Sequence, residues 1–120
     1  MARILLVAGA LVMALAVALG AYAAHAAKGA AHPEAARLLQ TAVLYQLVHG
    51  IGLLVAGVLS RFGASRCLAA AAGLHALGIV LFCGSLWVLA FAGQSLGPTA
   101  ALGGLAFIAG WIAMAVHVAR

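Results

Sequence analysis

The sequence predicts an all-α integral membrane protein, a four-helix antiparallel bundle with both termini in the cytoplasm. Hydrophobic residues make up 68% of the chain and charged residues only 6%. Glu34 is the only acidic residue, so a soluble fold would have almost no charged surface to keep it dispersed. Four apolar stretches each reach the roughly 20 residues that span a bilayer, and the short connections between them require antiparallel neighbours.

The predicted helices belong to one domain and cover residues 4–24, 34–60, 67–92 and 99–119 of the 1–120 chain. The first stretch is longer than the apolar core of about 7 to 15 residues in a signal peptide, which indicates a retained helix. The second helix is expected to begin near Pro33, because proline suits the first helical position. Turn-forming residues between Arg61 and Arg66 and between Gly93 and Pro98 separate the later helices.

Basic residues set the expected orientation. One side of the membrane receives Arg3, Arg61, Arg66 and Arg120, and the other receives Lys28 and Arg37. The positive-inside rule therefore favours cytoplasmic termini and a multi-pass protein in the cell inner membrane. The lipid bilayer is the expected partner of most of the surface.

Composition and spacing exclude several functions. The connections leave no room for a soluble catalytic domain, so we expect no enzyme activity. The basic residues are scattered singly, unlike the clusters that bind nucleic acid. The two cysteines, Cys67 and Cys83, share one helix about 24 Å apart, too far for a disulfide. No metal-ligand spacing occurs, and no catalytic or metal-binding residue is predicted.

A candidate polar pocket follows one stripe of the second helix. Its members are Thr41, Tyr45 and His49 at helical spacing, the adjacent Gln46, and His25 from the end of the first helix. An ionisable group at mid-membrane depth, such as His49, is by default a functional hypothesis. The structural interpretation is that Gln46 and His49 form hydrogen bonds between helices. The alternative is a path for a small molecule or an ion.

Two weaker candidates lie on the third helix. His75 is expected within roughly one helical turn of the depth of His49, so a b-type haem held by these two histidines is a second alternative. No basic cluster accompanies them for the haem propionates, and we predict no cofactor. Ser85 lacks the flanking glycines and the acid of a catalytic serine, and is expected to pack between helices.

Small residues recur at helical spacing on three helices. The sets are Ala10, Ala14 and Ala18, then Ala69 and Gly73, then Ala106 and Gly110. Such faces allow close approach either within the bundle or between protomers. The leading hypothesis is accordingly a structural or accessory membrane protein with a buried polar spot, forming a homo-oligomer or part of a larger assembly.

The chain resembles, over nearly its whole length, the membrane-protein family called domain of unknown function 423, which is related to eukaryotic transmembrane protein 256. The similar segments are residues 20–25, 41–49 with its Tyr-Gln-x-x-His element, 78–93, Gly103-Gly104 and Gly110-Trp111. The chain departs from the family pattern at Ala23, Cys83 and Ala100-Ala101. The resemblance implies a four-helix membrane protein of the inner or an organelle membrane, and it implies no activity.

Overall fold

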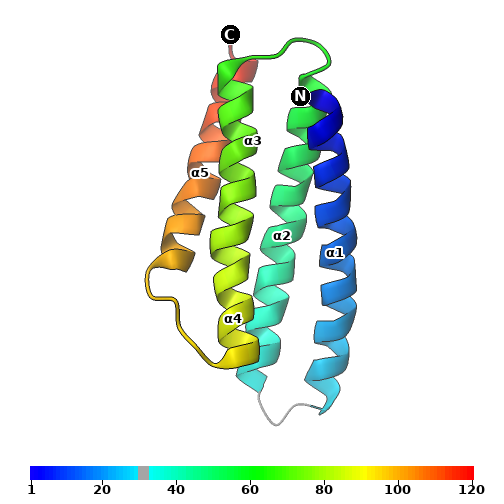
Figure 1. Ribbon diagram of the computed structural model, residues 1–120, viewed down its shortest axis with the longest axis vertical. Helices are drawn as coiled ribbons and strands as arrows, with labels where there is room; N and C mark the ends of the chain where they lie inside the picture. The colour runs from blue at the N-terminus through cyan, green and yellow to red at the C-terminus, as the bar shows by residue number, and fades with distance from the viewer. Residues whose placement is uncertain (30–32) are drawn as a thin grey trace.

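The computed structural model describes the backbone of residues 1–29 and 33–120, and helices account for most of it (Figure 1). In chain order these are α1 (Ala2–Gly29), α2 (Pro33–Leu59), α3 (Arg66–Gly78), a π-helical turn η1 (Ile79–Cys83), α4 (Gly84–Ala92) and α5 (Thr99–Val118). The segments α3, η1 and α4 follow one another without a break and form a single span, Arg66–Ala92. The described residues thus form four helices that are long and apolar enough to cross a membrane, which confirms the predicted all-α class with four spans.

Helix α1 is longer than the sequence predicted. It continues to Gly29, five residues beyond the predicted end, because alanines dominate this stretch and alanine has the highest helix propensity. The predicted helices left residues 25–33 as a connection, and residues 25–29 of this connection are helical. Residues 30–32, including His32, lie outside the described residues. Helix α2 begins at Pro33, as predicted.

The π-helical turn η1 is a feature that apolar periodicity does not predict. It widens the helix over Ile79–Cys83, near the middle of the span. The backbone of this turn lies against α5: a Cβ atom added to Gly103 would come within 2.5 Å of the Phe82 nitrogen. Such turns recur at functional sites in helices.

The helices form a layer in the order α1, α2, the α3–η1–α4 span and α5, so that α2 and the α3–η1–α4 span occupy the two inner positions (Figure 1). Helix α1 packs on α2 along its length, and α5 packs on α3 and η1 on the other side. Half of an apolar 18-residue stretch of α2 is buried within the protein, whereas only 11% of the corresponding stretch of α1 is buried. Helix α1 therefore presents most of its surface to lipid. Gly9 and Gly57 allow the close approach of α1 to α2, because each faces a leucine of the other helix.

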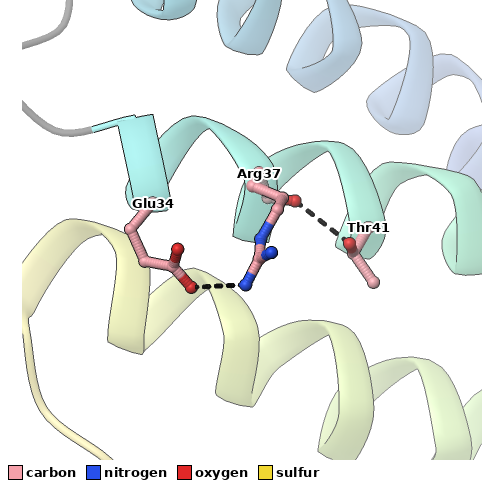
Figure 2. A network of polar contacts seen from close by, with 3 residues as sticks. All are labelled: Glu34, Arg37 and Thr41. Carbon is pink, nitrogen blue, oxygen red and sulfur yellow. Dashed lines mark hydrogen bonds and ion pairs between the residues drawn. The ribbon is translucent and has the colours of Figure 1, made fainter.

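Polar groups stabilise the helix ends. At the start of α2, Arg37 forms an ion pair of 3.0 Å with Glu34, and the Thr41 hydroxyl donates a hydrogen bond to the Arg37 carbonyl (Figure 2). At the opposite end of the layer, the Ser65 hydroxyl accepts a hydrogen bond from the Leu68 N–H and caps α3. The same hydroxyl lies 2.7 Å from Nδ1 of His117, which ties the end of α5 to the start of α3.

Both termini lie at the same end of the helices (Figure 1). Together with the charge bias, this arrangement predicts that a fluorescent protein fused after Arg120 fluoresces and that alkaline phosphatase fused there is inactive. Phosphatase inserted between Gly93 and Pro98 should be active, since that turn would lie on the outer side. The reverse pattern would contradict cytoplasmic termini.

Candidate aromatic and histidine site

Six ring-bearing side chains gather near the middle of the spans. We call them the aromatic cluster: Tyr45, His49, His75, Phe82, Phe107 and Trp111. They come from α2, α3, η1 and α5, so residues far apart in sequence meet at one depth. The shortest ring separations are 3.4 Å between His49 and Phe107 and 4.4 Å between Tyr45 and Phe82. The antiparallel packing therefore builds a site that no single helix contains.

His49 has a defined hydrogen-bonding role. Its Nδ1 lies 2.7 Å from the Tyr45 carbonyl oxygen, and because a carbonyl can only accept, Nδ1 carries the proton. In the neutral ring, Nε2 is then an acceptor, and it has no hydrogen-bond partner among the described residues. The ring stacks on Phe107 with an interplanar angle of 12°. This stacking and the bond to Tyr45 together hold the imidazole in place.

His75 is completely buried between two glycines. A Cβ atom at Gly52 of α2 would lie 2.8 Å from its Nε2, and one at Gly110 of α5 would lie 3.0 Å from its Cε1. Only glycine leaves room for the imidazole on both sides. Within the described part of the chain, neither ring nitrogen of His75 has a hydrogen-bond partner. The ring contacts Trp111 edge to face, at 4.7 Å, and His49 at 5.5 Å.

The geometry around His75 does not fit a haem held between the two histidines. A porphyrin needs a free slot beside the coordinating nitrogen, about 2 Å from the iron. The backbone of Gly52 closes the space at Nε2, and Gly110 closes the space at Nδ1. The residues described here also contain no group of three or more His, Cys, Asp or Glu side chains placed to hold a metal ion.

A groove of about 510 Å³ opens beside the cluster on the surface of the helix layer. Rings line it on one side, from Tyr45, His49, Phe82, Phe107 and Trp111. Ala101, Gly104, Leu105 and Ile108 of α5 complete the lining. Several of these residues are exposed, so the groove faces the surroundings of the protein laterally.

The structure brings together only part of the predicted polar pocket. Tyr45 and His49 both line the groove, whereas the buried Gln46 points to α1, where its amide donates a 3.0 Å hydrogen bond to the Val12 carbonyl. Thr41 bonds within its own helix, two turns away. His25 is exposed near the end of α1. Since Gly20 packs on Val43, His25 lies at about the level of Leu38, roughly 16 Å along α2 from His49.

The weaker candidates have different surroundings. His75 joins His49 in the aromatic cluster. The Ser85 hydroxyl donates to the Leu81 carbonyl of the preceding turn, as a packing serine within a helix does. Cys83 is buried and Cys67 partly buried, and both are free, as their separation predicted.

Five site residues were not among the predicted ones: Gly52, Phe82, Phe107, Gly110 and Trp111. Trp111 contacts both histidines, His49 at 6.1 Å and His75 at 4.7 Å between ring centroids. One available signal was the spacing of Gly52, three residues after His49, which places it on the same side of α2. The pairing of Gly110 with His75 depends on how α3 and α5 pack, and sequence periodicity does not specify that.

The four apolar spans of the described residues define a multi-pass membrane protein. Residues 19–104 match the family described as Protein of unknown function (DUF423). The chain belongs to this family, which confirms the resemblance noted in the sequence.

The curated relatives are membrane proteins as well. UPF0382 membrane protein SH2409 of Staphylococcus haemolyticus is 37% identical over 95% of this chain and 93% of its own length. UPF0382 membrane protein YwdK of Bacillus subtilis is 36% identical over 98% of both chains. UPF0382 inner membrane protein YgdD of Escherichia coli is 34% identical over 87% of this chain and 80% of its own. No solved structure is significantly similar to this chain.

Proposed function

We propose that this protein is a non-enzymatic structural or accessory component of the cell inner membrane that acts as a homo-oligomer. The observation that supports the proposal is the outer face of α1. Helix α1 packs on α2, and most of its apolar stretch is not covered by other helices of the protomer. A helix at the edge of the layer that packs mainly on one neighbour has a second face available for another protomer.

The small-residue faces divide into two kinds. Ala106 and Gly110 are buried, and Gly110 packs on the ring of His75, so this face is a seam within the protomer. Ala10, Ala14 and Ala18 are exposed on the side of α1 opposite the buried Ala16. Because apolar burial does not drive association in lipid, a smooth face of this kind favours contact between helices through close backbone packing.

The polar spot supports a structural role within each protomer. Gln46 joins α2 to α1 through the Val12 carbonyl, as interhelical hydrogen bonds do in membrane proteins. His49 and His75 pack among aromatic rings between α2, α3 and α5. For the alternative of a permeation path, polar side chains would have to continue toward both membrane surfaces. Of the buried polar side chains among the described residues, Gln46, His49 and His75 instead lie near mid-span, and Ser85 lies closer to one end of its span.

Replacing Ala14 by leucine tests the oligomer. The added side chain projects from the exposed face of α1 and should separate the protomers without disturbing the packing on α2. Native mass spectrometry of the detergent-released protein should show protomer multiples for the wild type and mainly monomer for Ala14→Leu. We expect the association constant to fall tenfold or more, which corresponds to at least about 1.4 kcal/mol.

The matched control is Ala115→Leu, which adds the same side chain at an exposed position of α5. It should leave the oligomer intact. A wild-type protein that remains monomeric in lipid nanodiscs would refute the homo-oligomer, and a bound chain of a different mass would support an accessory role in a larger assembly.

A further inference from the structure

The groove beside the aromatic cluster combines three properties that suit one kind of ligand. It lies at mid-span, since Tyr45, Phe82 and Phe107 are each near the centre of their helices. It is lined almost entirely by rings and aliphatic side chains. Its volume of about 510 Å³ is within the usual range of small-molecule sites.

We propose that this groove binds an uncharged, lipid-soluble aromatic alcohol, a phenol or hydroquinone, whose hydroxyl donates a hydrogen bond to Nε2 of His49. The ligand ring lies against the aromatic cluster, and its remaining substituents extend into the bilayer. The groove is built by α2, η1 and α5 of one protomer, so the proposal does not depend on an oligomer formed through α1.

The ligand needs a hydroxyl group because of the protonation and hydrogen bonding of His49. The side chain is 5% exposed, lines the groove, and has its Nδ1 proton committed to the Tyr45 carbonyl. Nε2 is therefore an acceptor without a donor among the described residues, at a depth where water is scarce. An acceptor in hydrocarbon favours a ligand that brings an O–H group, because an unpaired polar group there costs free energy.

The depth of the site selects against other membrane molecules. A phospholipid cannot bring its charged headgroup to mid-span, since charge at that depth is costly, and its acyl chains offer no donor to His49. A flat ring suits a groove in which the rings of Tyr45 and Trp111 are exposed, because aromatic pairs gain free energy beyond simple burial. A small neutral aromatic alcohol meets both requirements.

Gly104 supplies the space for the ligand. It lines the groove, and a Cβ atom added there would meet nothing within 4 Å. The space beside α5 is therefore empty of protein at this position. At the neighbouring Gly103, by contrast, an added Cβ atom would clash with Phe82. A large side chain at Gly104 can fill the groove without displacing a helix.

The test uses tritiated tetramethylhydroquinone, kept reduced under anaerobic conditions, and its dimethyl ether, which has the same ring without the O–H donors. Saturable binding is measured to wild-type protein in nanodiscs, with empty nanodiscs subtracted. The hydroquinone should bind about tenfold more tightly than the ether, the effect expected for one buried hydrogen bond.

Two variants locate the site. His49→Phe keeps the stacked ring but removes the acceptor, and it should bind both compounds equally. Gly104→Leu should lose binding of both compounds while its thermal stability stays unchanged. The control variant His25→Phe carries the same substitution at an exposed position far from the groove, and it should bind both compounds as the wild type does.

Three results would overturn the proposal: binding no greater than to empty nanodiscs, equal affinity of the wild type for the two compounds, or undiminished binding by folded Gly104→Leu. None of these results bears on the oligomer, whose test is the mass of the Ala14→Leu variant. The two proposals can therefore fail separately.

Discussion

Replacing Gly103 by alanine is expected to destabilise the protein by about 2–3 kcal/mol, although the change adds only one methyl group. That methyl would lie 2.5 Å from the backbone nitrogen of Phe82 and 2.9 Å from its Cα atom. Backbone atoms cannot rotate away as a side-chain end can, so α5 would have to move from η1. The contact between α5 and the π-helical turn would then open.

Gly104 provides the matched control one residue further along α5. Alanine there meets no atom within 4 Å and should be neutral or stabilising by up to about 1 kcal/mol, since alanine is the better helix former. Unfolding in mixed micelles with increasing SDS measures both variants. Equal stability of Gly103→Ala and Gly104→Ala would refute the close approach of α5 to η1.

The second large effect is expected at the glycines around His75. Gly52→Ala places a methyl group 2.8 Å from Nε2 of the imidazole. The ring cannot retreat, because Gly110 closes its other side, so we expect a loss of about 2 kcal/mol from overpacking. His75→Ala removes the ring and leaves a cavity, which is also destabilising.

A double-mutant cycle distinguishes the contact between Gly52 and His75 from a general loss of stability. In the His75→Ala background, Gly52→Ala should cost little, because its methyl group enters the vacated space, giving a coupling free energy of about 1–2 kcal/mol. The control cycle pairs His75→Ala with Gly73→Ala, at an exposed position of α3 where a Cβ meets nothing. Those two changes should be additive. Additivity at Gly52 as well would show that it does not contact the imidazole.

The residues of the candidate site differ in how far sequence predicted them. His49 and Tyr45 were selected because polar groups at mid-span are costly and recur at helical spacing, and both line the groove. His25 was grouped with them because it is the polar residue near the end of the first helix. The antiparallel pairing of α1 with α2 instead places it about three turns from His49.

The four membrane-spanning helices of the described residues follow from the sequence alone, because the length and apolarity of each stretch leave the backbone no other way to satisfy its hydrogen bonds in lipid. The start of α2 near Pro33 was predicted as well, since proline suits the first position of a helix. By contrast, the position of His75 between Gly52 and Gly110 and the stacking of Phe107 on His49 depend on how the helices pack. These contacts join helices distant in sequence, and they depend on interhelical register and on the π-helical turn, which local propensity and hydrophobic periodicity do not encode.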